Sequence, residues 1–242
     1  MSLSVAGIRV LHTAALAVGR DADNYQGFSP GTSILSSGHR KHEQARPFTI
    51  DTVFDRDFEV PMRDGTLLRA DAFRPDTSEK VPALLVWSPY GKSGAGVINL
   101  DFMPARAGIP QSALSGYEKF EGPDPVEWVP RGYAIVNIDA RGIFDSEGDV
   151  RVLGSAEGRD GYDAIEHIAR LPWCTGAVGL VGNSWLAMAQ YHIAAQQPPH
   201  LKCIAPLEGL SDMYRESLCR GGVPSPIFFR AIMQCLSGQR VA

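Results

Sequence analysis

The stretch GLVGNSWLA at residues 179–187 decides how this 242-residue chain is interpreted. Residues 178–181 form a short apolar run, typical of a buried parallel strand, and residues 185–197 are typical of a helix. A tight turn between them lifts the side chain of Ser184 to the carboxyl edge of a sheet. There the first amides of the helix can stabilise an oxyanion, so the hydroxyl is a candidate nucleophile.

The motif departs from the usual G-x-S-x-G pattern of such a turn. Leu186 stands where glycine is expected, and the small residue follows one position later, at Ala187. The alternative is an ordinary strand-to-helix turn in which Ser184 caps the helix. The motif alone leaves both interpretations open.

Three segments of the chain extend this signal and occur in a fixed order. They are VWSPYGKSG at residues 86–94, RGIFDSEGD at residues 141–149 and PWCTGAVGLVGNSWL at residues 172–186. Together they resemble the CocE/NonD hydrolase family, which groups cocaine-esterase-like enzymes with X-Pro dipeptidyl-peptidases. The resemblance spans residues 58–214, the first half of the family's catalytic domain. It implies an α/β-hydrolase fold that uses a serine.

The resemblance also implies a role for each of three residues. Ser184 would be the nucleophile, the backbone N–H of Trp185 one oxyanion donor, and the hydroxyl of Tyr90 the second donor. The position of Tyr90 agrees, because residues 88–91 follow an apolar strand at residues 82–87. The alternative for Tyr90 is that its ring packs over a turn. Three other polar residues are expected to brace a loop: Asp139, Arg141 and Ser146.

Composition indicates a soluble globular protein with one main domain. The chain is 44% hydrophobic, with a formal net charge of −4. It therefore has no basic surface for nucleic acid or an anionic membrane. No G-x-G-x-x-G follows a strand, which argues against a dehydrogenase, and no cofactor or metal is expected. The cysteines lack metal-ligand spacing and are expected to be reduced core thiols of a cytoplasmic protein: Cys174, Cys203, Cys219 and Cys235.

The first forty-six residues are expected to form a polar extension. Arg9 interrupts the mildly apolar start, which excludes a transmembrane helix and a convincing secretory signal. A mitochondrial leader is the alternative to a cytoplasmic location, because the first acidic residue is Asp21. His39 and His42 lack a carboxylate or cysteine to complete a metal site. We expect both in solvent, in an irregular segment.

From residue 47 the pattern becomes regular. Residues 57–60 and 67–74 predict an antiparallel hairpin, with Asp64 and Gly65 in its turn. Buried parallel strands are predicted at residues 82–87, 133–138, 178–181 and 202–205, with a helix at residues 157–170. Alternating strands and helices predict an α/β fold with a doubly wound, mostly parallel sheet.

The end of the chain resembles the opening of a helical cap. A helix is predicted at residues 212–218, and later apolar residues have helical spacing: Ile227, Phe228, Ile232 and Met233. The resemblance implies that such a cap is inserted near this point. We therefore divide the chain into the polar extension 1–46, the front portion of the hydrolase domain 47–210 and the start of the cap 211–242.

The base that would activate Ser184 is not evident. In α/β-hydrolases the acid and the histidine follow the nucleophile, and only His192 and His200 do so here. His192 lies eight residues along the helix, about 12 Å from the catalytic edge. His200 precedes the strand at residues 202–205 and so lies at the amino edge. His167 is expected near that same edge.

Acidic residues are easier to place. Glu208 and Asp212 follow the last strand on the correct side, although Asp212 also suits a helix N-terminus. The resemblance places the acid and the histidine later, after the cap. We therefore expect both beyond Ala242, and the fold to be incomplete at its carboxyl end.

Two hypotheses follow. The first is a serine hydrolase that cleaves a small-molecule carboxylic ester or a peptide amide through an acyl-enzyme on Ser184. The second is a catalytically incompetent fragment or binding remnant that lacks the acid and the histidine. A sheet that ends at residues 202–205 leaves an unpaired edge, which is expected to self-associate or to bind a completing chain.

Overall fold

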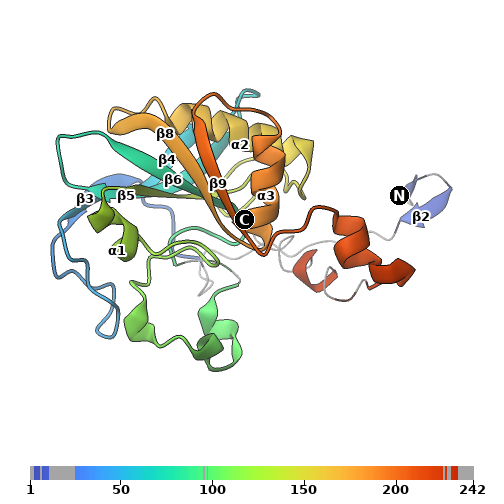
Figure 1. The fold of residues 1–242 in the computed structure, drawn as a ribbon, viewed down its shortest axis with the longest axis horizontal. Helices are drawn as coiled ribbons and strands as arrows, with labels where there is room; N and C mark the ends of the chain where they lie inside the picture. The colour runs from blue at the N-terminus through green and yellow to red at the C-terminus, as the bar shows by residue number, and fades with distance from the viewer. Residues whose placement is uncertain are drawn as a thin grey trace.

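The structure, a computed structural model, describes residues 3–5, 7–10, 25–94, 96, 98–225, 227 and 230–233. Its centre is a seven-stranded sheet in the order β3-β4-β5-β7-β6-β8-β9 (Figure 1). A small separate sheet pairs β1 (Leu3–Val5) with β2 (Ile8–Val10). The predictions made for Cys235 and Phe228, and for most of the first twenty residues, lie outside the described residues.

The antiparallel half of the sheet contains the predicted hairpin, formed by β4 (Thr52–Pro61) and β5 (Leu67–Pro75). Gly65 has a φ of 84° in the turn, a conformation that glycine adopts without strain. β4 begins at Thr52, five residues earlier than predicted, and Asp57, with a φ of 53°, forms a bulge within it. The bulge interrupts the alternation of side chains and so hid the first part of the strand.

An edge strand inside the polar extension was not predicted. β3 (Gly31–Leu35) pairs antiparallel with β4, although the first forty-six residues were expected to form only a polar extension. Only Leu35 of this strand is buried, so the sequence shows no alternation. The expectation for His39 was also wrong, because its ring is half-buried, with Nε2 2.9 Å from the hydroxyl of Tyr117. His42 is exposed, as expected.

The parallel half of the sheet matches the prediction. β7 (Ala134–Asp139) and β8 (Cys174–Asn183) flank β6 (Val81–Ser88), and β9 (Leu201–Leu207) follows β8. All these pairs are parallel. β9 was expected to be buried, but Lys202, Cys203 and Ala205 are exposed. The prediction of a core thiol is therefore wrong for Cys203, because β9 is the edge strand of the sheet and its outer side has no neighbouring strand.

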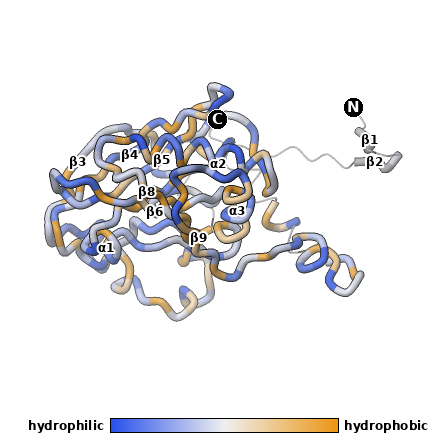
Figure 2. Tube along the Cα trace, turned by 45° about the horizontal axis from the view of Figure 1, so that its top comes forward, coloured by the Kyte–Doolittle hydropathy of each residue, from blue (hydrophilic) through white to orange (hydrophobic). Residues whose placement is uncertain are grey.

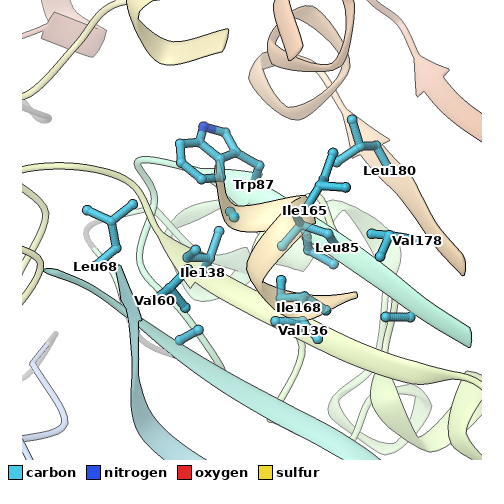
Figure 3. Packing of buried hydrophobic residues seen from close by; sticks show 14 of the residues in the cluster. Val60, Leu68, Leu85, Trp87, Val136, Ile138, Ile165, Ile168, Val178 and Leu180 are labelled. Atoms are coloured by element: carbon cyan, nitrogen blue, oxygen red, sulfur yellow. The ribbon is translucent and has the colours of Figure 1, made fainter. Parts of the chain in front are cut away.

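Two helices pack against each other beside the sheet, α2 (Ser155–Ile168) and α3 (Trp185–Ala194) (Figure 1). Right-handed crossovers from β7 to β8 and from β8 to β9 place both on one face. Figure 3 shows Ile165 and Ile168 of α2 over the apolar side chains of the central strands. Figure 2 shows apolar segments along the strands and in α3, interspersed with hydrophilic ones.

Residues 89–133 connect β6 to β7 in the opposite direction along the sheet. They contain the short helix α1 (Pro125–Trp128). Within this connection, short 3-10 segments lie at Leu100–Phe102, Pro104–Gly108, Gln111–Ala113 and Val129–Arg131. A further 3-10 turn, Arg220–Gly222, lies near the end of the chain. This long connection lies next to the carboxyl ends of the parallel strands.

The predicted helix at residues 212–218 is shorter in the structure. A single π-helical turn spans Tyr214–Leu218. Asp212 lies just before this turn and accepts a hydrogen bond from the Arg215 amide at 2.9 Å. Farther on, Ile227 is 83% exposed, and the helical-cap assignment of residues 211–242 stays a prediction. Within the described ranges, no helix combines the length and apolarity that a membrane span requires.

Candidate active site

Ser184 lies between β8 and α3, at the carboxyl edge of the parallel strands. Its backbone has φ 55° and ψ −115°, a region that a residue with a side chain adopts only under strain. Two backbone hydrogen bonds hold the turn, from the Ser184 amide to the Leu207 carbonyl and from the Asn183 amide to the Glu121 carbonyl, each at 3.0 Å. The strained conformation is therefore fixed by β9 and by the 89–133 connection.

The turn also explains the departure from the usual motif. Gly182 has a φ of 146°, and a Cβ there would lie 2.4 Å from the side chain of Leu186. Leu186 is buried and occupies the space beside this glycine. A leucine is thus accommodated at the last motif position, because the glycine two residues before Ser184 leaves room for it.

Tyr90 is buried and lies beside Ser184, in the loop that follows β6. Its ring meets Phe120 edge-on at 5.7 Å and Trp185 at 6.4 Å between ring centroids. Its hydroxyl hydrogen-bonds with the Ser184 side chain, while burial raises the pKa of Tyr90 above its ordinary value. The phenol therefore stays protonated and can donate to an anion.

Two lysines, the buried Lys119 and the partly buried Lys92, hold the loop that carries Tyr90. Lys119 Nζ donates to the carbonyls of Gly91 and Ile138, each at 2.7 Å. Lys92 Nζ lies 2.5 Å from a carboxylate oxygen of Asp57. A buried ammonium without such partners would be strongly unfavourable, so these contacts fix the loop relative to the end of β7.

Trp185 is the first residue of α3 and is buried. The first amides of a helix have no partner inside the helix, so its N–H is available at the carboxyl edge of the sheet. Its indole N–H donates to Glu157 at 3.1 Å. The structure thus brings together the three residues selected from the sequence, Ser184, Tyr90 and Trp185.

Glu121 was not selected from the sequence, yet its carboxyl lies within interaction range of the Ser184 side chain. Burial, together with the charge of nearby Glu208, raises the pKa of Glu121 to about 7. It lies in the irregular 89–133 connection, which has no periodicity that could have shown its position. The backbone bond that its carbonyl accepts from Asn183 is the contact that brings it to the serine.

A cavity of about 510 Å³ opens next to this group of residues. Glu121 and Asn183 line the end adjoining Ser184, and His42 lines another part. Its apolar lining comes from the 89–133 connection: Leu100, Met103, Ile109, Leu114 and Phe120. The volume suits a small molecule or a short peptide segment. The described residues include no group of three or more potential metal ligands.

The three histidines that follow the start of α2, His167, His192 and His200, do not lie next to Ser184. His200 Nδ1 lies 2.8 Å from a carboxylate oxygen of Glu166, at the amino edge where β9 begins. His167 lies in the last turn of α2, and burial lowers its pKa. His192 lies in the last turn of α3, away from the serine end, and burial lowers its pKa.

The residues expected to brace a loop do so. The Arg141 guanidinium forms two hydrogen bonds with Asp160, both at 2.8 Å. The Ser146 hydroxyl donates to the carbonyl of Asp139 at 2.8 Å and accepts from the Arg69 amide at 2.9 Å. These contacts join the loop after β7 to α2 and β5.

The sequence model of the X-Pro dipeptidyl-peptidase (S15 family) matches residues 64–240. The chain belongs to this family. It is 36% identical over 156 residues to a cocaine esterase from Rhodococcus sp. (strain MB1 Bresler), covering 64% of this chain and 24% of that relative. The chain therefore spans about a quarter of the length of this relative.

Solved structures confirm the fold. A CocE/NonD family hydrolase from Staphylococcus aureus superposes with a TM-score of 0.69 at 32% identity, covering 86% of this chain and 36% of that one. An α-amino acid ester hydrolase, at 21% identity and a TM-score of 0.58, has the same fold. Both the resemblance to the CocE/NonD family and the α/β-hydrolase fold predicted from the sequence are thus confirmed.

Proposed function

We propose that the protein is a serine hydrolase that cleaves a carboxylic ester or an amide through an acyl-enzyme on Ser184. The strained turn between β8 and α3 is the observation that carries the proposal, because a nucleophile elbow requires a strained strand-to-helix turn of this kind. The attacked carbonyl oxygen becomes an oxyanion that the Tyr90 hydroxyl and the Trp185 N–H stabilise. Water then hydrolyses the acyl-enzyme.

A base must remove the Ser184 proton, and we assign this step to a histidine outside the described residues. The placement of His200 at the amino edge, of His167 at the end of α2 and of His192 at the end of α3 supports this assignment. The acid that orients the histidine is assigned in the same way. The S15 family and the cocaine esterase relative support both an ester and an X-Pro peptide as substrate.

Labelling with a fluorophosphonate probe tests the nucleophile. The protein expressed from its complete coding sequence should be labelled, and Ser184→Ala should abolish the signal. Ser211→Ala is the matched control, because Ser211 also follows a strand at the carboxyl edge but donates its hydroxyl to Glu216 at 2.8 Å. Unchanged labelling of Ser184→Ala would place the nucleophile elsewhere.

We also propose a cytoplasmic location and association through the edge strand β9. The three cysteines in the described part of the chain, Cys174, Cys203 and Cys219, are free thiols, which supports a reducing compartment.

The exposed side of β9, where Leu207 is 57% exposed, supports pairing with a second copy or a completing chain. Sedimentation of the purified 242-residue chain should show self-association that Ala205→Lys reduces.

A further inference from the structure

Glu157 lies in the first turn of α2, and its side chain is 1% exposed. One carboxylate oxygen, Oε1, accepts hydrogen bonds from the indole N–H of Trp87 at 2.9 Å and of Trp185 at 3.1 Å. The other oxygen, Oε2, accepts from the amide of Leu153 at 2.7 Å. One buried carboxyl therefore joins α2 to the end of β6 and to the start of α3.

Each of the two tryptophans is linked to one of the two proposed oxyanion donors. Trp185 supplies one donor through its own backbone N–H, and its ring contacts Tyr90 edge-on at 6.4 Å and 70°. Trp87 precedes Tyr90 by three residues and is almost fully buried. Fixing both indoles therefore fixes the backbone at the start of α3 and the ring that presents the Tyr90 hydroxyl.

We propose that Glu157 is the positioning residue of the oxyanion hole, an inference that rests on the proposed function of Ser184. It touches neither the substrate nor the reacting atoms, and it acts through the two indoles. An oxyanion donor is effective only within about 2.7–3.1 Å of the developing charge. A displacement of about 1 Å in the site can cost about a hundredfold in rate.

The surroundings of Glu157 favour this role over simple core packing. Burial raises the pKa of Glu157 to about 7, against the lowering by its hydrogen bonds from Trp87, Trp185 and Leu153. Burying a carboxyl here costs free energy, which core packing alone does not require. Phenylalanine in place of either tryptophan would fill the core without an N–H that needs a hydrogen-bond acceptor. Glu166, on the same helix, instead accepts from His200 at the amino edge.

Glu157→Gln is the first variant, compared with Glu166→Gln as the matched control. The amide has one acceptor oxygen and one NH₂ group, so it cannot accept from the indoles and from the Leu153 amide at once. In the protein expressed from its complete coding sequence, we expect kcat to fall about 10- to 100-fold, with KM within about threefold. Glu166→Gln should leave kcat unchanged.

A boronic acid that forms a tetrahedral adduct on serine separates positioning from stability. Glu157→Gln should weaken its binding by about the same factor as kcat, because the adduct oxygen occupies the oxyanion position. Trp185→Phe keeps the backbone N–H and an aromatic ring, and it removes the indole N–H that bonds to Glu157. It should therefore lower kcat and boronate affinity in the same direction, and it serves as the readout if Glu157→Gln does not fold.

Three outcomes separate the claims. Loss of boronate affinity together with kcat, in Glu157→Gln or in Trp185→Phe, supports the positioning role. Normal kcat and normal boronate affinity in the folded variants overturn it, even when Ser184→Ala abolishes labelling. Unchanged fluorophosphonate labelling of Ser184→Ala would instead refute the proposed function itself.

Discussion

At the amino edge of the sheet the Glu166 carboxylate pairs with His200 at 2.8 Å, whereas at the carboxyl edge Glu121 and Glu208 lie near each other beside Ser184. The first pair joins a carboxylate to a group that can be positively charged. The second pair brings two carboxyls of like charge together, and burial, with the charge of Glu208, raises the pKa of Glu121 to about 7. A carboxylate that pairs with a positively charged group stabilises the structure. Carboxyls that lie together without such a partner have shifted pKa values, which is typical of functional sites.

The strongest test of this contrast is the activity of the 242-residue chain by itself. We expect it to hydrolyse p-nitrophenyl acetate at least about a thousandfold more slowly than the product of the complete coding sequence, because we assign the base to a histidine outside the described residues. His200→Ala and His192→Ala should not change the residual rate. Robust turnover that either substitution destroys would show that a described histidine reaches Ser184 after all.

Tyr90→Phe should have the next largest effect. Removing one oxyanion donor is expected to lower kcat by about 10- to 1,000-fold, with a much smaller change in KM. The ring keeps its contacts with Phe120 and Trp185, so thermal unfolding should change little. A variant with normal kcat would mean that Tyr90 only packs over the turn and that another group is the second donor.

Glu121→Gln tests the uncompensated charge directly. The pKa of Glu121 is raised from its ordinary 4.5 to about 7, so the carboxyl ionises as the pH passes neutrality and places a negative charge next to the oxyanion. The ratio of variant to wild-type kcat should therefore rise severalfold between pH 5.5 and pH 8.5. Loss of turnover by more than about a hundredfold at every pH would instead identify Glu121 as the base for Ser184.

The same variant has a consequence for stability. A carboxyl whose pKa is raised on folding stabilises the fold below its unfolded pKa, and this contribution is lost as the pH rises through the folded pKa. Glu121→Gln should therefore raise the unfolding temperature at pH 8 but not at pH 4.5. A rise of about 1–3 °C is expected after allowance for partial exposure. Differential scanning calorimetry at the two pH values checks the sign.

Much of the fold could be predicted because its central strands are apolar runs separated by turn signals. The β4–β5 hairpin was evident from Asp64 and Gly65, and the order of elements around Ser184 followed from the alternation of strands and helices. β3 escaped because four of its five residues are exposed, so it has no apolar pattern. A strand that pairs mainly through its backbone cannot be found by periodicity.

The site could be predicted in part. Ser184 and its elbow depend on local sequence, and Tyr90 was found through a family resemblance. Glu121 reaches Ser184 only because the long connection from β6 folds back onto the turn, and nothing near Glu121 in the sequence indicates this. Glu157 was visible only as the start of a predicted helix. Its contacts with two tryptophans depend on how three elements meet.

The smallest effect on turnover is expected at the amino edge, for Glu166→Gln. The Glu166 carboxylate also lies 3.5 Å from the exposed guanidinium of Arg170, and His200 is 37% exposed, so solvent weakens both pairings. Such pairs contribute about 0–1 kcal/mol, and the unfolding temperature at pH 7 should fall by at most about 2–4 °C. The kcat should not change, because this edge is opposite Ser184. A tenfold loss of kcat in a folded Glu166→Gln variant would show that the two edges are coupled through α2, and the contrast between them would no longer hold.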